Sequence, residues 1–370
     1  MRTRLARIAS TPLVAIVTLA GTVAVAALLL APLPAARAQQ RTPAAKKAQK
    51  QSAQYHVAKQ IAAGGEGGWD YLAVDTAAHR VYVSHATHVV VLDADRDSVV
   101  GDIPNTPGVH GIALAPALGR GWTSNGRDSS VTVFDLKTLA TKSTIKVTGR
   151  NPDAILYEPV TRRVFTFNGG SASATAIDAA TDSVLGTIPL GGKPEFARAD
   201  GEGSVFVNIE DTGELVKFDA RTLAVRARWP LAPCEEPTGL AFDRAHARLF
   251  AVCSNKLMAV VDTRTGRLVK TLPIGEGSDG AAFDPATQLA FSSNGEGTLT
   301  VVHEDAPDRF TVVGTVPTQR GARTIVLDER THRLYTATAR YGEAPAPTAD
   351  RPRPRPPMIP GSFTILVLER

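Results

Sequence analysis

Seven residues with polar side chains recur along this 370-residue chain at spacings of 40 to 44 residues. They are four carboxylates, one imidazole, one hydroxyl and one guanidinium: Asp70, His110, Asp153, Glu195, Thr238, Asp279 and Arg323. Carboxylates bind hard cations such as Ca²⁺, and an arginine beside them can clamp an anionic group. If each residue begins the same strand of a repeated unit, all seven form one ring. The sequence therefore predicts a polar ligand site at that ring.

A second polar set falls in loops that the same repeat would open on the same face. Its members are mainly amides: His85, Asn125, Asn168, Asn208 and Asn294, with Asn255 in the remaining copy. Amide oxygens complement carboxylates around Ca²⁺, but Asn-Gly is also ordinary turn chemistry. Two interpretations stay open, a binding site or a solvated channel mouth. Ca²⁺ is the candidate cofactor, and the presence of any metal is undecided.

Histidines offer a different kind of metal site. His85, His88 and His110 could approach one another between the first two repeats and bind a soft metal, although no close ligand spacing requires it. Three other histidines, His79, His246 and His332, fall in turns at the opposite end of the unit. We expect those turns to be solvated.

The repeat itself is clearest in a strand that ends in an acidic residue or its substitute. The copies end at Asp93, Asp135, Asp178, Asp219, Asp262, His303 and Glu369. A strand of the type Arg-Val-Tyr-Val precedes this one in most copies, beginning at Arg80, Arg163, Arg248 and Arg333. Such alternation of β-branched and aromatic residues is typical of strands. The acid at the strand end is expected to accept backbone N–H groups and hold the following turn.

Four strands in each unit of about 42 residues match one blade of a propeller. The predicted fold is therefore all-β, a seven-bladed β-propeller of four-stranded blades over residues 55–370. The last copy ends at Arg370 without a fourth strand, and residues 55–61 resemble the fourth strands of other copies. We expect this N-terminal strand to complete the last blade and close the ring.

The units that combine Arg-Val-Tyr-Val, an apolar strand ending in Asp, and Gly-x-Ile-Pro resemble the YVTN-repeat, or YncE-like, propeller family. The resemblance covers residues 55–370. It implies an exported or surface-associated seven-bladed propeller. The family's biochemical roles are mostly unassigned, although one member is associated with single-stranded DNA.

The N-terminus has the features of an export signal. Residues 1–38 contain a basic start, an apolar run and the small-x-small sequence Ala36-Arg37-Ala38. Cleavage and retention as a membrane anchor are both open, and a basic, flexible tail at 39–54 would follow. Either outcome predicts a periplasmic or secreted protein.

Net charge depends on which part of the chain is counted. The whole chain carries a formal charge of +5, but residues 55–370 contain 33 basic and 36 acidic residues, a balance of −3. Because residues 55–370 are weakly acidic, strong electrostatic binding to nucleic acid is disfavoured.

Two further features bear on the predicted mouth. Cys234 and Cys253 are the only cysteines, and in an exported protein they suggest one disulfide, with two free thiols as the alternative. A Pro-rich insertion at 341–361 interrupts the last blade and carries Arg351, Arg353 and Arg355. We expect it to cross the mouth, either as a lid or docking arm or as a solvated loop.

The sequence supports three functional hypotheses. The first is a monomeric binding or scaffold propeller with a small polar ligand or a protein partner. The second is a metal-dependent hydrolase or lactonase that uses the same ring. The third is a nucleic-acid or cell-surface binder that uses Arg323, the insertion and the basic tail. Common catalytic motifs, such as Gly-x-Ser-x-Gly and His-Glu-x-x-His, are absent from the sequence, so the chain is more consistent with a binding protein than an enzyme.

Overall fold

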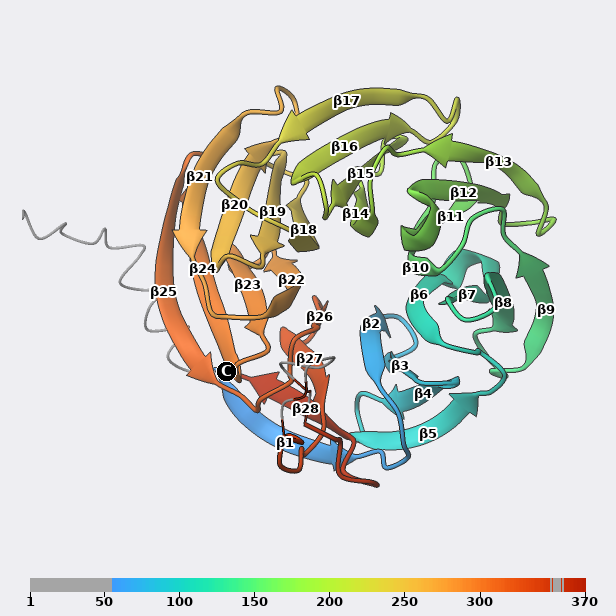
Figure 1. Ribbon diagram of the computed structural model, residues 1–370, viewed down its shortest axis with the longest axis vertical. Helices are drawn as coiled ribbons and strands as arrows, with labels where there is room; N and C mark the ends of the chain where they lie inside the picture. Colours follow the sequence, from blue (N-terminus) through green and yellow to red (C-terminus); the bar gives the residue numbers. More distant parts are fainter. Residues whose placement is uncertain (1–54, 347, 349–353, 355) are drawn as a thin grey trace, which may run out of the picture. The chain divides into compact units, whose positions relative to one another are not determined.

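Seven four-stranded antiparallel sheets surround a common centre (Figure 1). The structure is a computed structural model, and it describes residues 55–346, 348, 354 and 356–370. The seven-bladed propeller predicted from the repeat is confirmed. The predicted signal and tail, together with Arg351, Arg353 and Arg355, lie outside the described residues.

The first strand of each blade lies innermost (Figure 1). These strands are β2 (Trp69–Asp75), β6 (Val109–Ala115), β10 (Pro152–Glu158), β14 (Pro194–Ala199), β18 (Pro237–Asp243), β22 (Ser278–Asp284) and β26 (Val326–Asp328). The second strands are β3 (Arg80–His85), β7 (Arg120–Asn125), β11 (Arg163–Asn168), β15 (Ser204–Ile209), β19 (Arg248–Cys253), β23 (Leu289–Asn294) and β27 (Arg333–Thr338). Two short 3-10 helices, η1 (Pro116–Leu118) and η2 (Gly169–Ser171), lie in turns.

The third and fourth strands complete each blade toward the rim. The third strands are β4 (His88–Asp93), β8 (Ser130–Asp135), β12 (Ser173–Asp178), β16 (Glu214–Asp219), β20 (Leu257–Asp262), β24 (Thr298–Ala306) and β28 (Thr364–Glu369). The outer strands are β5 (Ser98–Ile103), β9 (Thr141–Lys146), β13 (Val184–Pro189), β17 (Val225–Pro230), β21 (Leu268–Pro273), β25 (Arg309–Pro317) and β1 (His56–Ala62).

The core lies between the faces of neighbouring blades. Second and third strands are buried on both sides, so aromatic residues such as Tyr82, Phe165 and Tyr335 have no exposed surface. Outer strands are mostly exposed, as in β13 and β17. Face-to-face packing of successive sheets thus buries the apolar second strands that made the repeat visible in the sequence.

The arginine that opens most second strands joins one blade to the next. Arg163 Nη1 donates to the carbonyl oxygens of Ala220 and Arg221 in the following blade, at 2.6 and 2.7 Å. Equivalent bonds run from Arg80, Arg120 and Arg333 to the blade after each. The repeated arginine therefore links neighbouring blades, because its guanidinium donates hydrogen bonds to carbonyl groups at the end of a neighbouring third strand.

The acid at the end of each regular third strand holds a turn, as expected. Asp178 Oδ1 accepts the backbone N–H groups of Ala180 and Thr181 at 2.9 and 2.8 Å. Asp93, Asp135, Asp219 and Asp262 repeat this arrangement. These aspartates therefore have a structural role in stabilising the turns.

The ring closes through the two ends of the described chain. β1 pairs antiparallel with β28, from His56 opposite Glu369 to Ala62 opposite Thr364. Tyr55 is buried beside this junction, and its hydroxyl donates to the His332 carbonyl oxygen at 3.1 Å. The seventh blade thus combines three C-terminal strands with one N-terminal strand, as predicted.

Cys234 and Cys253 form a disulfide within the fifth blade, with their Cα atoms 5.8 Å apart. Both residues are buried. Within the part of the chain that the structure describes, no helix has the length and apolar character needed to cross a membrane.

Candidate functional site

The propeller gathers six of the seven ring residues at one end of the innermost strands. Each sits at or just before the start of its strand, so antiparallel alternation places them all on the face where second strands end and third strands begin. Arg323 precedes β26, which is shorter than its counterparts and begins only at Val326. We call this end of the channel the mouth, and the group Asp70, His110, Asp153, Glu195, Asp279 and Arg323 the mouth cluster.

His110 links two carboxylates of the mouth cluster. Its Nδ1 lies 2.7 Å from Asp70 Oδ2 and 3.6 Å from Asp153 Oδ1. Ligand atoms of these three residues lie within 4.8 Å of one another, close enough for one metal ion to contact all three. The three residues come from β2, β6 and β10, so the arrangement depends on correct packing of three blades.

Arg323 neutralises the other side of the mouth cluster. Its Nε donates to Asp279 Oδ2 at 2.7 Å, and its Nη2 lies 3.9 Å from Asp70 Oδ1. The same Nη2 donates to the Trp69 carbonyl oxygen at 3.1 Å, which fixes the guanidinium above the Trp69 ring. Asp279 and Asp70 are therefore partly compensated.

Asp153 is the least compensated carboxylate at the mouth. It is 7% exposed, and its Oδ1 accepts no hydrogen bond from the described residues. Burial raises the pKa of Asp153 well above its usual range, and the charges of Asp70 and Asp279 raise it further. The site around Asp153 therefore has a deficit of positive charge or of hydrogen-bond donors.

Glu195 and Asp279 show the same electrostatic crowding. Burial raises the pKa of Glu195 to about 9, and the charges of Asp153 and Asp279 add to this effect. Burial and the charge of Asp70 raise the pKa of Asp279, although Arg323 opposes them. A bound cation would relieve this repulsion among the carboxylates.

Sequence reasoning missed three groups that adjoin Glu195. Lys193 Nζ lies 3.4 Å from Glu195 Oε2 and forms a close ion pair with Glu210. The Tyr71 hydroxyl lies 3.5 Å from Glu195 Oε1 and is buried. Glu210 follows the end of β15, two residues after the predicted Asn208, and only the loop conformation turns it toward Lys193.

The remaining predicted residues lie beside the mouth cluster, and their side chains form hydrogen bonds with other groups of the propeller. Thr238 donates to the carbonyl oxygens of Val252 and Ser278 at 3.3 and 3.0 Å. Asn125 is fully buried and bonds to side chains of its own blade, as do Asn168 and Asn294. Asn208 donates to two backbone carbonyls of the next blade. The structure thus gives these four asparagines no solvent-facing surface.

The three histidines between the first two blades do not converge on one point. The rings of His85 and His88 are 5.0 Å apart, while His85 is buried and stacks on Phe363 at 4.0 Å. Burial lowers the pKa of His85 to about 4, and the charge of His88 contributes. His110 bonds instead to Asp70.

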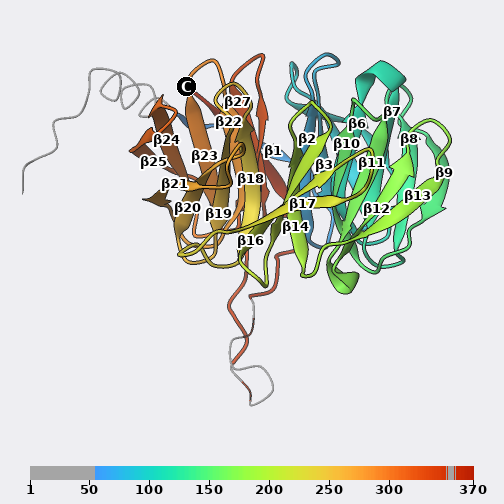
Figure 2. The same ribbon diagram turned by 90° about the horizontal axis from the view of Figure 1, so that it is seen from above.

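A cavity of about 750 Å³ adjoins the mouth cluster. Trp69, Arg320 and Arg323 line it together with parts of the Pro-rich insertion, including Tyr341 and Met358. The described ends of this insertion leave the ring at the mouth face (Figure 2). The two ends of the insertion therefore form one wall of this cavity, which we call the vestibule. Its volume is in the range that holds small molecules.

The channel continues beyond the mouth as a cavity of about 420 Å³ between the innermost strands. Arg198 and Arg244 line its deeper part. Burial lowers the pKa of Arg198 to about 10, and the charge of Arg244 adds to this shift. The channel is thus acidic at the mouth and basic further in.

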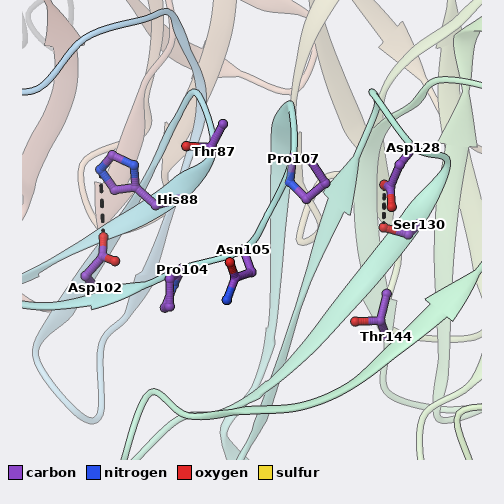
Figure 3. A pocket seen from close by; sticks show the side chains of 9 residues that line it. All are labelled: Thr87, His88, Asp102, Pro104, Asn105, Pro107, Asp128, Ser130 and Thr144. Atoms are coloured by element: carbon purple, nitrogen blue, oxygen red, sulfur yellow. Dashed lines mark hydrogen bonds and ion pairs between the residues drawn. The ribbon is translucent and has the colours of Figure 1, made fainter.

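A separate open pocket of about 660 Å³ lies between the first two blades (Figure 3). Its charged side chains already have partners: Asp128 accepts from Ser130 at 2.6 Å, and His88 Nε2 lies 3.7 Å from Asp102. This pairing makes the pocket a weaker candidate than the mouth.

Comparisons with known proteins support the fold alone. No family model and no curated protein match this chain. Among solved structures, it is similar to a chain of Kuenenia stuttgartiensis hydrazine synthase, with a TM-score of 0.64 and 16% identity. The similarity covers 73% of this chain and 92% of that chain. At this identity it says nothing about activity, and membership in the YVTN-repeat family stays a prediction.

Proposed function

We propose that this chain is an exported binding propeller that holds a small, positively charged ligand at the channel mouth. The observation that carries the proposal is Asp153, a buried carboxylate with an oxygen that accepts no hydrogen bond from the described residues, surrounded by Asp70, Asp279 and Glu195. A metal cation or an organic amine would supply the missing charge. The vestibule beside Trp69 and Arg323 gives such a ligand an approach from solvent.

Thermal unfolding tests this proposal on the full chain after dialysis against EDTA. Ca²⁺, Mn²⁺ and the diamine putrescine are added separately. A ligand that binds only the folded state raises the midpoint by mass action. We expect one of these probes to raise the midpoint, and Asp153→Asn to abolish the increase.

Glu202→Gln is the matched control, because Glu202 is an exposed acid with no role at the mouth. It should respond as the wild type does. A wild type that responds to none of the three probes, or an Asp153→Asn variant that gains as much from the effective probe, would contradict the proposed binding of that probe at the mouth.

A metal-dependent hydrolase is the second candidate, favoured by the convergence of Asp70, His110 and Asp153. A metal held by three protein ligands has room for a water molecule that it can activate. Hydrolysis of lactone or ester substrates by the metal-loaded wild type, lost in Asp153→Asn, would support this candidate over simple binding.

A further inference from the structure

Glu304 breaks the propeller repeat at a buried position. It follows His303, which stands at the acidic position of the repeat. Five other blades carry small or apolar residues after that position, Ala94, Leu136, Ala179, Ala220 and Thr263, and the seventh blade carries Arg370. The backbone confirms the equivalence, because Glu304 N donates to the Gln288 carbonyl as Ala94 N does to that of His79. A glutamate in place of alanine puts a carboxyl group into the interface between the fifth and sixth blades.

The burial of this glutamate is poorly compensated by hydrogen bonds. It is 3% exposed, and neither of its carboxylate oxygens accepts a hydrogen bond from the described residues. Burial raises the pKa of Glu304 to about 8, and the charge of Asp243 adds to the effect. A buried carboxyl that faces a second acid and a partly exposed histidine is costly to a fold, so a ligand that satisfies it would be stabilising.

Two residues of the fifth blade face Glu304. His246 Nδ1 lies 2.6 Å from Asp243 Oδ2 and 3.1 Å from Glu304 Oε1. Ligand atoms of all three residues lie within 4.8 Å of one another. We expected His246 to be solvated, but it contacts two buried acids, while about a third of its own side chain stays open to solvent.

Neighbouring cations do not fill this role. Arg248 is the closest, and its guanidinium is used by Asp262 and by the carbonyls of His246, Ala247 and Pro307. The corresponding interface between the sixth and seventh blades shows the contrast. There the buried Asp284 meets His332 at 2.9 Å and Arg370 at 3.3 Å, with no second acid.

We propose that Asp243, His246 and Glu304 bind a divalent transition-metal ion of the zinc type, which joins the fifth and sixth blades. One imidazole nitrogen and two carboxylate oxygens are ligand types that zinc accepts, and a water molecule would complete four-coordination on the open side of His246. Binding requires the free lone pair of His246 Nδ1 and deprotonated carboxylates, so any proton shared by the carboxyl pair leaves to solvent. This site lies at the end of the blades opposite the mouth and is independent of the ligand proposed there.

Zinc binding to the chelator-treated full chain tests the proposal. Glu304→Ala installs the residue that three other blades have at this position, so the variant should fold. We expect it to bind one equivalent fewer of Zn²⁺ by calorimetry than the wild type. It should also lose the visible absorption bands of one bound Co²⁺. His246→Gln should do the same.

Two further variants locate the loss. Asp308→Asn removes a nearby exposed acid and should keep the full stoichiometry. Asp153→Asn reports any zinc held at the mouth and should leave the equivalent assigned to Glu304 in place. If Glu304→Ala and the wild type bind the same number of zinc equivalents, the proposal is wrong. The cluster is then a carboxyl pair that shares a proton.

Discussion

Buried carboxylates at the mouth couple the stability of this propeller to pH. The pKa of Glu195 rises from 4.5 to about 9 because the folded chain buries the carboxyl beside Asp153 and Asp279. Between those pH values the folded state holds a proton that the unfolded state has lost. Stability therefore falls as the pH rises through this window.

Glu195→Gln should reduce this pH dependence, since an amide does not titrate. We expect the wild type to lose more unfolding free energy than the variant between pH 5.5 and pH 9. The difference should be at least about 1.4 kcal/mol, the equivalent of one pKa unit. Urea unfolding at both pH values measures it. Glu202→Gln should follow the wild type, and equal pH dependence in all three proteins would contradict the interpretation.

At the scale of the strand and the blade, inter-blade contacts depend on a few repeated polar groups. The second-strand arginines bond to carbonyls of the following blade, and the third-strand aspartates hold the turns there. These groups connect sheets whose interfaces are built largely from apolar side chains. Their repetition explains why the sequence pattern includes charged residues inside an apolar fold.

Arg163→Ala should lower the unfolding free energy by about 1.5–3 kcal/mol, the usual value of hydrogen bonds to a charged group. The loss arises because two carbonyls of the fourth blade lose their donor. Denaturant unfolding gives the value. Arg264→Ala changes an exposed arginine in a turn and should cost less than about 0.5 kcal/mol. Equal losses of unfolding free energy in both variants would contradict the role of Arg163 as a link between blades.

The disulfide of the fifth blade gives a second prediction at this scale. Cys234 and Cys253 are separated by 19 residues, so the crosslink should contribute about 3 kcal/mol by restricting the unfolded chain. The double variant Cys234→Ser, Cys253→Ser should lose about that much in a chemical melt. Reducing agent should destabilise the wild type alone, and a reductant effect on the double variant would contradict this origin.

At the scale of the whole molecule, one strand pairing closes the ring. β1 and β28 come from opposite ends of the described chain and are paired along their full length. Without β1, the backbone groups of β28 form an exposed sheet edge, which favours association with other chains.

A chain that begins at Ala63 should therefore melt at a lower temperature than one that begins at Tyr55, and it should aggregate. The chain that begins at Tyr55 keeps β1 and the buried Tyr55, so it is the matched control. Thermal melts and size-exclusion chromatography compare the two. Monomeric behaviour and an unchanged midpoint for the shorter chain would show that β1 is dispensable.

The fold could be predicted from the sequence because each blade repeats the same apolar and turn positions. The mouth cluster was also visible, since residues at one register of a closed repeat must meet. The asparagines shared that regularity but lie inside the blades, and spacing alone does not say which way a side chain points. Lys193 and Glu210 depend on loop conformation. Glu304 was detectable as the one acid at a position of the repeat that is mostly small or apolar.

The pairing of β1 with β28 also sets an order of assembly. The first strand of the propeller to be synthesised must wait for the last, so the seventh blade cannot form until β28 has been synthesised. Six blades can collapse earlier from local hairpins, but the non-local closure comes last and is expected to be slow. Once closed, the ring can open only by separating this pair or splitting a packed interface. The native state should therefore be long-lived as well as stable.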